Sequence, residues 1–327
     1  MKFRTEYKAE KSDIILSPAV PVAFVGSCFS ENIAGIMRAS LWDARNPLGT
    51  LYNPLSIANV LELSLLSLFP EREYEKTLFL KDDKYYSRLF DSRFSAYLAA
   101  DCMAAFTSRR NSLWEVMAAG SVLIVTFGTA WVYELKEQQG YVVGNCHKLP
   151  AEKFDRRRLS VMEIVERWDS LLVALKRKFP QLKVIFTVSP VRHLKDGFEG
   201  NSLSKSILRI AIDEICGKHS YCCYFPAFEI VTDDLRDYRF YGEDLVHPSS
   251  MAVDYVWEKF KETFLDKDAL ELLSECEKIA KRISHRPLPD SSILIPEEIK
   301  AKEMISHKNI LDSYNTLKER YPAILDM

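Results

Sequence analysis

The sequence predicts an α/β protein built on a mostly parallel sheet with helices on both faces. Two observations support this fold class. Continuous apolar and β-branched runs, typical of buried parallel strands, recur at residues 20–25, 121–128 and 183–191. Stretches with helical periodicity lie between and after these runs, and such an alternation of strand and helix is typical of a parallel sheet. In sheets of this kind the functional residues lie at the carboxyl ends of the strands.

The first third of the chain opens with a strand and a helix. Val20–Val25 is predicted as the strand and Glu31–Ser40 as the helix, with Ser30 as a plausible N-cap. Asn46–Pro54 contains two Asn-Pro pairs and a glycine, which predicts a turn. Residues 81–91 are polar and aromatic and indicate a hairpin or an irregular insertion. Helical spacing is also found in two longer stretches, Leu55–Leu68 and Ser92–Met117.

The remaining elements continue the alternation. Ser121–Tyr133 contains a buried strand that ends at Gly128, and Lys183–Val191 contains a second one that ends at Ser189-Pro190. Tyr221–Ile230 is predicted as a third strand. The basic run at residues 156–158 is interpreted as the solvated start of a helix. Helices are predicted over Val161–Lys178, Leu203–Lys218 and Met251–Leu265, and a loop over Gly242–Ser250.

The end of the chain has a different pattern, which divides the sequence into two parts. Residues 1–265 form the predicted α/β domain, and residues 266–327 form a helical extension. Within the extension, Lys267–Ser284 is a charged amphipathic helix, His285–Ser292 is a proline-broken linker, and Leu294–Met327 resumes helical periodicity. We expect these helices to pack on the domain or on a partner chain, which would form a homo-oligomer.

Composition excludes several classes of function. The 44 basic and 46 acidic residues leave a net charge of −2, so no global field favours nucleic acid or an anionic membrane. No apolar run is long enough for a secretion signal or a membrane span. The seven cysteines are irregularly spaced, as expected for buried thiols in a reducing compartment, and this predicts a cytoplasmic protein. Neither a set of metal-ligand residues nor a phosphate-binding glycine loop is present, so we expect no metal and no cofactor.

Two short segments contain residues suited to nucleophilic chemistry. Ser27 and Cys28 follow the first predicted strand, where helix N–H groups stabilise an anion. Taken alone, this segment favours a turn of small residues, in which Gly26 forms the bend, Ser27 is a cap and Cys28 fills the core. Asp244 and His247 are three residues apart in a loop, a spacing that allows the carboxylate to orient the imidazole as a general base. The alternative is a coincidental surface pair.

The two segments together resemble the SGNH (GDSL-type) hydrolases, which place a nucleophile after the first strand and an Asp-x-x-His block before the final helix. The closer resemblance is to the GSCFA-domain family, a branch of that superfamily named for its Gly-Ser-Cys-Phe-Ala opening. Gly26–Ser30 matches this opening with serine in the last place. Further blocks that resemble the family cover roughly residues 2–264: NPLGTLYNP, TFGTAWVYE, GNCHKLP, TVSPVRH and FPAFEIVTDDLRDYRFYGEDLVHPS.

The resemblance implies a three-layer α/β/α fold and an esterase-like hydrolase. Aligning Gly26 with the glycine of the Gly-Asp-Ser block makes Cys28 the nucleophile, whereas a slip of one residue makes it Ser27. The alignment without a slip favours Cys28. His247 is then the general base and Asp244 the residue that orients it.

The resemblance also implies an oxyanion hole and a substrate pocket. Gly49 suits the glycine position of the hole. No asparagine occupies the usual third block, so Thr129 or Asn145 is expected to replace it. His147 is expected to line the pocket with Asn145 or to be a structural histidine. Arg192 is expected to hold a carboxylate or a sugar hydroxyl, or to form an ordinary salt bridge.

The function predicted on these grounds is hydrolysis of an acylated carbohydrate or a small acyl ester. One alternative is a catalytically inactive fold that binds an acylated or glycan ligand, or a partner protein. A further alternative is acyl transfer to an acceptor other than water.

Overall fold

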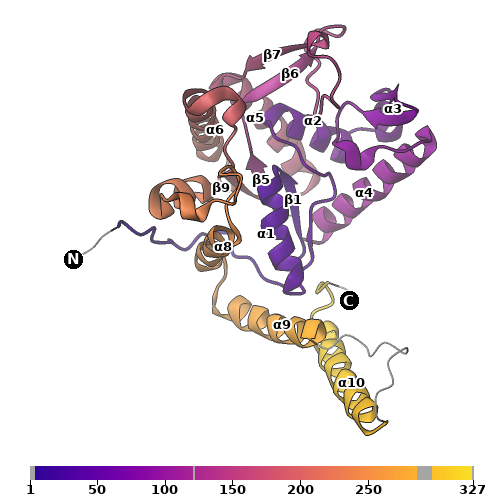
Figure 1. The fold of residues 1–327 in the computed structure, drawn as a ribbon, viewed down its shortest axis with the longest axis vertical. Helices are drawn as coiled ribbons and strands as arrows, with labels where there is room; N and C mark the ends of the chain where they lie inside the picture. The colour runs from indigo at the N-terminus through magenta and orange to yellow at the C-terminus, as the bar shows by residue number, and fades with distance from the viewer. Residues whose placement is uncertain (1–3, 121, 286–296, 326–327) are drawn as a thin grey trace.

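A five-stranded parallel sheet forms the centre of the protein in the computed structural model, which describes residues 4–120, 122–285 and 297–325 (Figure 1). The strands follow the order β2-β1-β5-β8-β9, and every neighbouring pair is parallel. Their bounds are Ala44–Arg45 (β2), Val22–Gly26 (β1), Val122–Phe127 (β5), Lys183–Val188 (β8) and Cys222–Tyr224 (β9). The predicted mostly parallel α/β fold is therefore confirmed.

The two faces of the sheet carry separate apolar cores, because successive side chains of a strand point in opposite directions. Ala23 and Val25 of β1 belong to one core, and Val22 and Phe24 belong to the other. The second core is covered by α1 (Cys28–Ala39) and α8 (Ser250–Phe264). The first is covered by α2 (Pro54–Leu65), α4 (Ala99–Ala119), α5 (Val161–Lys178) and α6 (Gly197–Lys218). Helix, sheet and helix thus form the three layers.

Helix α1 begins three residues earlier than predicted. Ser27 has extended backbone angles and its Oγ accepts a hydrogen bond from the Phe29 N–H at 3.3 Å, so Ser27 is the N-cap. The hydroxyl of Ser30, the expected cap, instead donates to Thr126 Oγ1 at 2.7 Å. The prediction of Ser30 as the cap was wrong because its hydroxyl finds a partner on β5, a contact that local sequence does not encode.

The basic run at residues 156–158 is a strand and not the start of a helix. It lies in β7 (Phe154–Arg158), which pairs antiparallel with β6 (Trp131–Leu135). The Arg156 guanidinium lies 4.1 Å from the centre of the Trp131 ring, and Arg157 forms ion pairs with Glu134 and Glu163. These contacts, made across the hairpin and to the following helix, outweigh the solvation that was expected for the run.

The third predicted strand is shorter than expected. Only Cys222–Tyr224 pairs with β8, and the chain then turns at Pro226, which has no N–H to donate to a neighbouring strand. A short helix, α7 (Ala227–Glu229), and a π-helical turn, η4 (Ile230–Leu235), follow.

A hairpin overlaps the predicted insertion at residues 81–91. Its first strand is β3 (Leu78–Lys81), which begins before the insertion, and its second strand is β4 (Lys84–Ser87), which lies within it. Asp82 and Asp83 have positive φ angles, as a type I′ turn requires. The other short helices are α3 (Pro70–Glu75), η1 (Ser92–Phe94), η2 (Ala151–Lys153), η3 (Leu194–Asp196) and η5 (Tyr238–Phe240).

Two helices extend from the end of the α/β unit (Figure 1). They are α9 (Lys267–His285) and α10 (Glu297–Arg320), and they share an apolar cluster that includes Leu41. Most of the predicted linker His285–Ser292 lies outside the described residues. The domain boundary at residue 265 and assembly through these helices stay predictions. Among the described residues, none of the helices has the length and apolar character needed to cross a membrane.

Candidate active site

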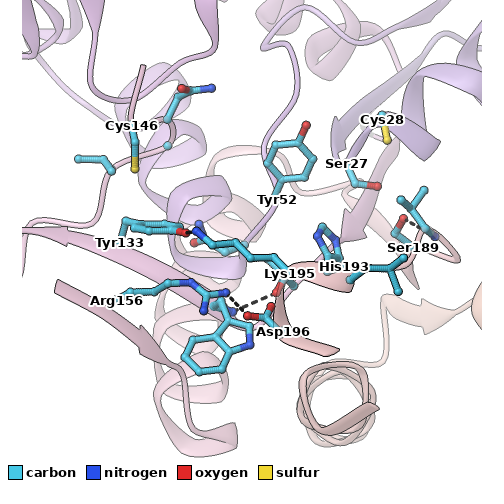
Figure 2. A pocket seen from close by; sticks show the side chains of 18 of the residues that line it. Ser27, Cys28, Tyr52, Tyr133, Cys146, Arg156, Ser189, His193, Lys195 and Asp196 are labelled. Carbon is cyan, nitrogen blue, oxygen red and sulfur yellow. Dashed lines mark hydrogen bonds and ion pairs between the residues drawn. The ribbon is translucent and has the colours of Figure 1, made fainter. Parts of the chain in front are cut away.

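A cavity of about 640 Å³ lies at the carboxyl ends of the central strands (Figure 2). Its wall includes Ser27 and Cys28 after β1, Thr129 after β5, Ser189 after β8, and His247 from the loop before α8. The structure thus brings the turn after the first strand and the Asp-x-x-His loop, more than 200 residues apart, to the same cavity.

Gly26 fixes the turn that carries Ser27 and Cys28. Its φ is +136°, and a Cβ at this position would lie 2.2 Å from the carbonyl oxygen of Thr126. That carbonyl accepts a hydrogen bond from the Ser27 N–H at 3.1 Å, so β1 and β5 remain in contact up to the turn. Only glycine fits here, and its use lets Cys28 occupy the first position of α1.

The two candidate nucleophiles differ in accessibility. Ser27 is 1% exposed, and its hydroxyl oxygen is engaged as the cap of α1. Cys28 is partly exposed. Burial raises the pKa of the Cys28 thiol, although the backbone N–H groups of Cys28 and Phe29 and the charge of Lys205 oppose this shift. Because the pKa remains raised, the thiol needs a nearby base to become a nucleophile at neutral pH.

Asp244 and His247 form a hydrogen-bonded dyad at the rim of the cavity. His247 Nδ1 lies 2.6 Å from Asp244 Oδ2. The other oxygen, Asp244 Oδ1, accepts the N–H groups of Val246 at 2.9 Å and His247 at 3.0 Å. These backbone bonds, followed by the imidazole, lower the pKa of Asp244 to about 2. An ionised carboxylate therefore orients the ring and leaves Nε2 free to accept a proton.

Gly49, expected to be an oxyanion donor, is not part of the cavity wall. It is buried in a turn with a φ of +74°, and a Cβ there would lie 2.6 Å from Asp91 Oδ2. The same carboxylate accepts the Thr50 N–H at 2.7 Å. The glycine is thus explained by the tight turn around Asp91 and not by contact with the cavity.

Thr129 lines the cavity, but its hydrogen-bonding groups are already used. Its N–H and that of Gly128 both donate to the Tyr52 carbonyl, at 2.9 and 2.8 Å. Its hydroxyl bonds to Ser204 Oγ at 3.1 Å and accepts the Trp131 N–H at 3.2 Å. The N–H of Thr129 is therefore already used within the fold, and its hydroxyl oxygen contacts Ser204 and Trp131.

Asn145 lines the cavity and His147 does not. Asn145 Oδ1 accepts the His147 N–H at 2.8 Å, whereas Asn145 Nδ2 has no partner among the described residues. His147 is 7% exposed, and its Nε2 lies 2.7 Å from the Ser87 carbonyl oxygen. Burial lowers the pKa of His147, so its neutral ring can donate to that carbonyl. These contacts fit a structural role for His147. The side-chain amide of Asn145 is available to a substrate.

Lys205 of α6 is a residue that sequence reasoning missed. It is 2% exposed, and its Nζ donates to the carbonyl oxygens of Gly128 and Ser189, each at 2.7 Å. It thereby joins the ends of β5 and β8, which both line the cavity. Burial lowers its pKa to about 7. The available signal was a lysine three residues before Leu208, on the apolar face of its helix.

His193, like His147, lies in a block that resembles the family, and the sequence favours a structural role for it over a catalytic one. It lines the cavity, and its ring packs edge-to-face on Tyr52 with 6.1 Å between ring centres. Its Nε2 is buried with no hydrogen-bond partner among the described residues. Burial, followed by the charge of Lys205, lowers its pKa to about 4, so the ring is neutral at physiological pH.

The wall opposite Ser27 and Cys28 in Figure 2 is aromatic and charged. It contains Tyr133 and Arg156 of the β6–β7 hairpin. No cluster of three or more His, Cys, Asp or Glu side chains suited to a metal ion occurs in the described part of the chain.

The chain matches a protein family. The model of the GSCFA family matches residues 21–260, from the residue before β1 to the last turns of α8, and so spans the sheet and the whole cavity wall. No curated protein matches the chain. Because the family match covers well over half of the 327 residues, the chain belongs to the GSCFA family.

Proposed function

We propose that this GSCFA protein is an SGNH-type ester hydrolase. The observation that carries the proposal is that Cys28, at the N-terminus of α1, and His247, held by Asp244, line one cavity. The resemblance of both segments to the SGNH nucleophile and Asp-x-x-His blocks supports the same assignment. A cavity of about 640 Å³ is within the usual range for small-molecule sites, so an acylated sugar or small acyl ester is a suitable substrate.

We assign the nucleophile to Cys28. Register favours it, its side chain is more exposed than that of Ser27, and its sulfur lies at a helix N-terminus. The Ser27 hydroxyl oxygen caps the helix, a role that competes with attack on a substrate.

The reaction proceeds in two steps. His247 Nε2 takes the proton of the Cys28 thiol as the sulfur attacks the acyl carbonyl, and the alcohol leaves with that proton as the thioester forms. Water, activated by the same imidazole, then attacks the thioester, which releases the carboxylic acid and returns the proton to sulfur. Asp244 stabilises the imidazolium in both steps. The N–H groups at the start of α1 and the Asn145 amide are the groups available to stabilise the oxyanion.

One observation favours a second candidate, a catalytically inactive fold that binds an acylated or glycan ligand. Gly49, expected to donate to the oxyanion, is not among the residues that line the cavity. An oxyanion hole short of one donor loses about two to three orders of magnitude in rate. Substrate binding without turnover would then be the remaining activity.

Short-chain p-nitrophenyl esters and acetylated sugars, assayed with the wild type and four variants, test the proposal. We expect Cys28→Ala and His247→Ala to lower kcat/KM at least 100-fold, and Ser27→Ala to retain activity. Cys216→Ala, at a partly buried thiol of α6, is the matched control. Equal background rates for the wild type and His247→Ala would refute the hydrolase and leave the binding protein. Loss of activity in Ser27→Ala alone would move the nucleophile to Ser27.

A cytoplasmic location is also a proposal. It is supported by the irregular spacing of the seven cysteines, each of which is a free thiol in the structure. Fractionation of cells that express the protein tests it directly.

A further inference from the structure

The cavity wall has an excess of positive charge, although the whole chain has a net charge of −2. The wall contains three cationic residues, Arg156, Arg192 and Lys195, and one acidic residue, Asp196. Arg156 and Asp196 form an ion pair with each other, and the Asp196 side chain is 5% exposed, so this acid is unavailable to the other two cations. Arg192 and Lys195 remain.

Arg192 is held in place without an acidic partner. Its N–H donates to the Val246 carbonyl at 3.2 Å, which ties the segment after β8 to the loop that carries His247. Its guanidinium lies 4.1 Å from the centre of the Tyr241 ring and 4.9 Å from that of Tyr238. It forms no ion pair with any residue that the structure describes, so the salt bridge considered from the sequence is not observed. A guanidinium stacked in this way presents a fixed fork of donors that suits a carboxylate or a phosphate.

Lys195 supplies the second cation, from the wall that faces the hairpin. Its Nζ donates to the Tyr133 hydroxyl at 2.6 Å and lies 5.2 Å from the centre of that ring. Figure 2 shows the extended side chain reaching toward Tyr133. It makes no contact with a carboxylate in the described residues, and an ammonium with one such bond keeps two donors for a ligand.

We propose that the substrate carries an anionic group, a carboxylate or a phosphate, that Arg192 and Lys195 bind in this cavity. This inference rests on the proposed esterase function and narrows its substrate class. Both side chains belong to the cavity wall and neither forms an ion pair with a described carboxylate, so an anionic ligand would supply the partner that they lack. Because Arg192 is tied to the His247 loop, the anionic group lies close to the reacting ester.

Hydrolysis of matched ester pairs tests the inference and identifies the anion. p-Nitrophenyl butyrate and p-nitrophenyl hemisuccinate have acyl chains of equal length, and only the second ends in a carboxylate. 6-O-acetylglucose and 6-O-acetylglucose 1-phosphate differ by a phosphate on the alcohol side. We expect the wild type to prefer the anionic member of at least one pair by on the order of tenfold in kcat/KM. Arg192→Gln removes that preference, and the matched control Arg177→Gln, on the exposed face of α5, keeps it. Equal kcat/KM values within both pairs would overturn the inference.

A binding measurement separates this inference from the esterase proposal. Calorimetric titration compares succinate with butyrate and glucose 1-phosphate with glucose, using the wild type, Arg192→Gln and Arg177→Gln. If the wild type hydrolyses no ester yet binds one anionic ligand about tenfold more tightly than its neutral counterpart, and Arg192→Gln abolishes this difference, the anion site stands and only the hydrolase fails. Hydrolysis of the neutral esters without any preference for anions in either assay refutes the anion site and leaves the hydrolase.

Discussion

Replacing Lys205 by methionine should change how the stability of the protein depends on pH. Lys205 is buried and its pKa is lowered from 10.5 to about 7, because burial disfavours the ammonium. In the unfolded chain the same group titrates near its ordinary value. Between pH 7 and 10.5 the unfolded chain therefore binds more protons than the folded one, and stability rises with pH across that window.

The magnitude follows from the two pKa values. At pH 7 the buried lysine lowers the free energy of unfolding by about 4 kcal/mol relative to a group with no shift, and at pH 9 by about 2 kcal/mol. The wild type should therefore gain about 2 kcal/mol over Lys205→Met between pH 7 and pH 9. The absolute stabilities are less informative, because methionine leaves the carbonyls of Gly128 and Ser189 without their donor, at a cost of about 1–3 kcal/mol each.

Urea unfolding at half-unit pH steps measures this difference. Lys218→Met, at the exposed end of the same helix, is the control and should follow the wild-type curve in shape, since that ammonium is solvated in both states. A wild-type minus Lys205→Met difference that stays constant from pH 7 to pH 9 would refute the reasoning. It would mean that the hydrogen bonds from Lys205 to the two carbonyls compensate fully for the hydration that its ammonium loses on folding.

Three further predictions concern the site. Gly26→Ala should lower the free energy of unfolding by about 3 kcal/mol or more, measured by urea unfolding, because its Cβ would lie 2.2 Å from the Thr126 carbonyl oxygen; a loss below about 1 kcal/mol would contradict the required positive φ. Asp244→Asn should lower kcat about 10⁴-fold with little change in Tm, since the dyad is exposed; unchanged kcat would show that His247 needs no orienting carboxylate. Alkylation of Cys28 by iodoacetamide, followed by mass spectrometry, should be slower at pH 7 than that of free cysteine and should rise steeply as pH increases, because the pKa of the thiol is raised; rapid labelling at pH 6 would oppose this.

The parts of the fold that the sequence predicted are those that depend on local pattern. The strands at β1, β5 and β8 are continuous apolar runs buried on both faces, and this signal lies within each segment. Helix α5 begins after Ser160 as expected, because its capping box is local too.

The errors arose where a distant partner decides the outcome. The run at residues 156–158 became a strand because Trp131 and Glu134, more than 20 residues away, supply its contacts. Ser27 caps α1 in place of Ser30, whose hydroxyl donates to Thr126 on another strand. The same limit applies to the site. The predicted order of strands and helices was enough to place Cys28 and His247 near the same edge of the sheet. The hydrogen bonds from Lys205 to the ends of two strands could not be predicted, because they depend on how α6 packs against the sheet.

The described part of the C-terminal tail attaches to the domain at the end of α1 that lies farther from the cavity. The chain returns from α10 to the domain where the Leu325 N–H donates to the Leu41 carbonyl at 2.9 Å, just past the end of α1. Cys28 stands at the other end of that 12-residue helix, about 18 Å away along its axis. A partner bound to the described part of the tail, such as the proposed second copy of the chain, would therefore contact the end of α1 opposite Cys28, and the proposed assembly would be compatible with the proposed entry of substrate.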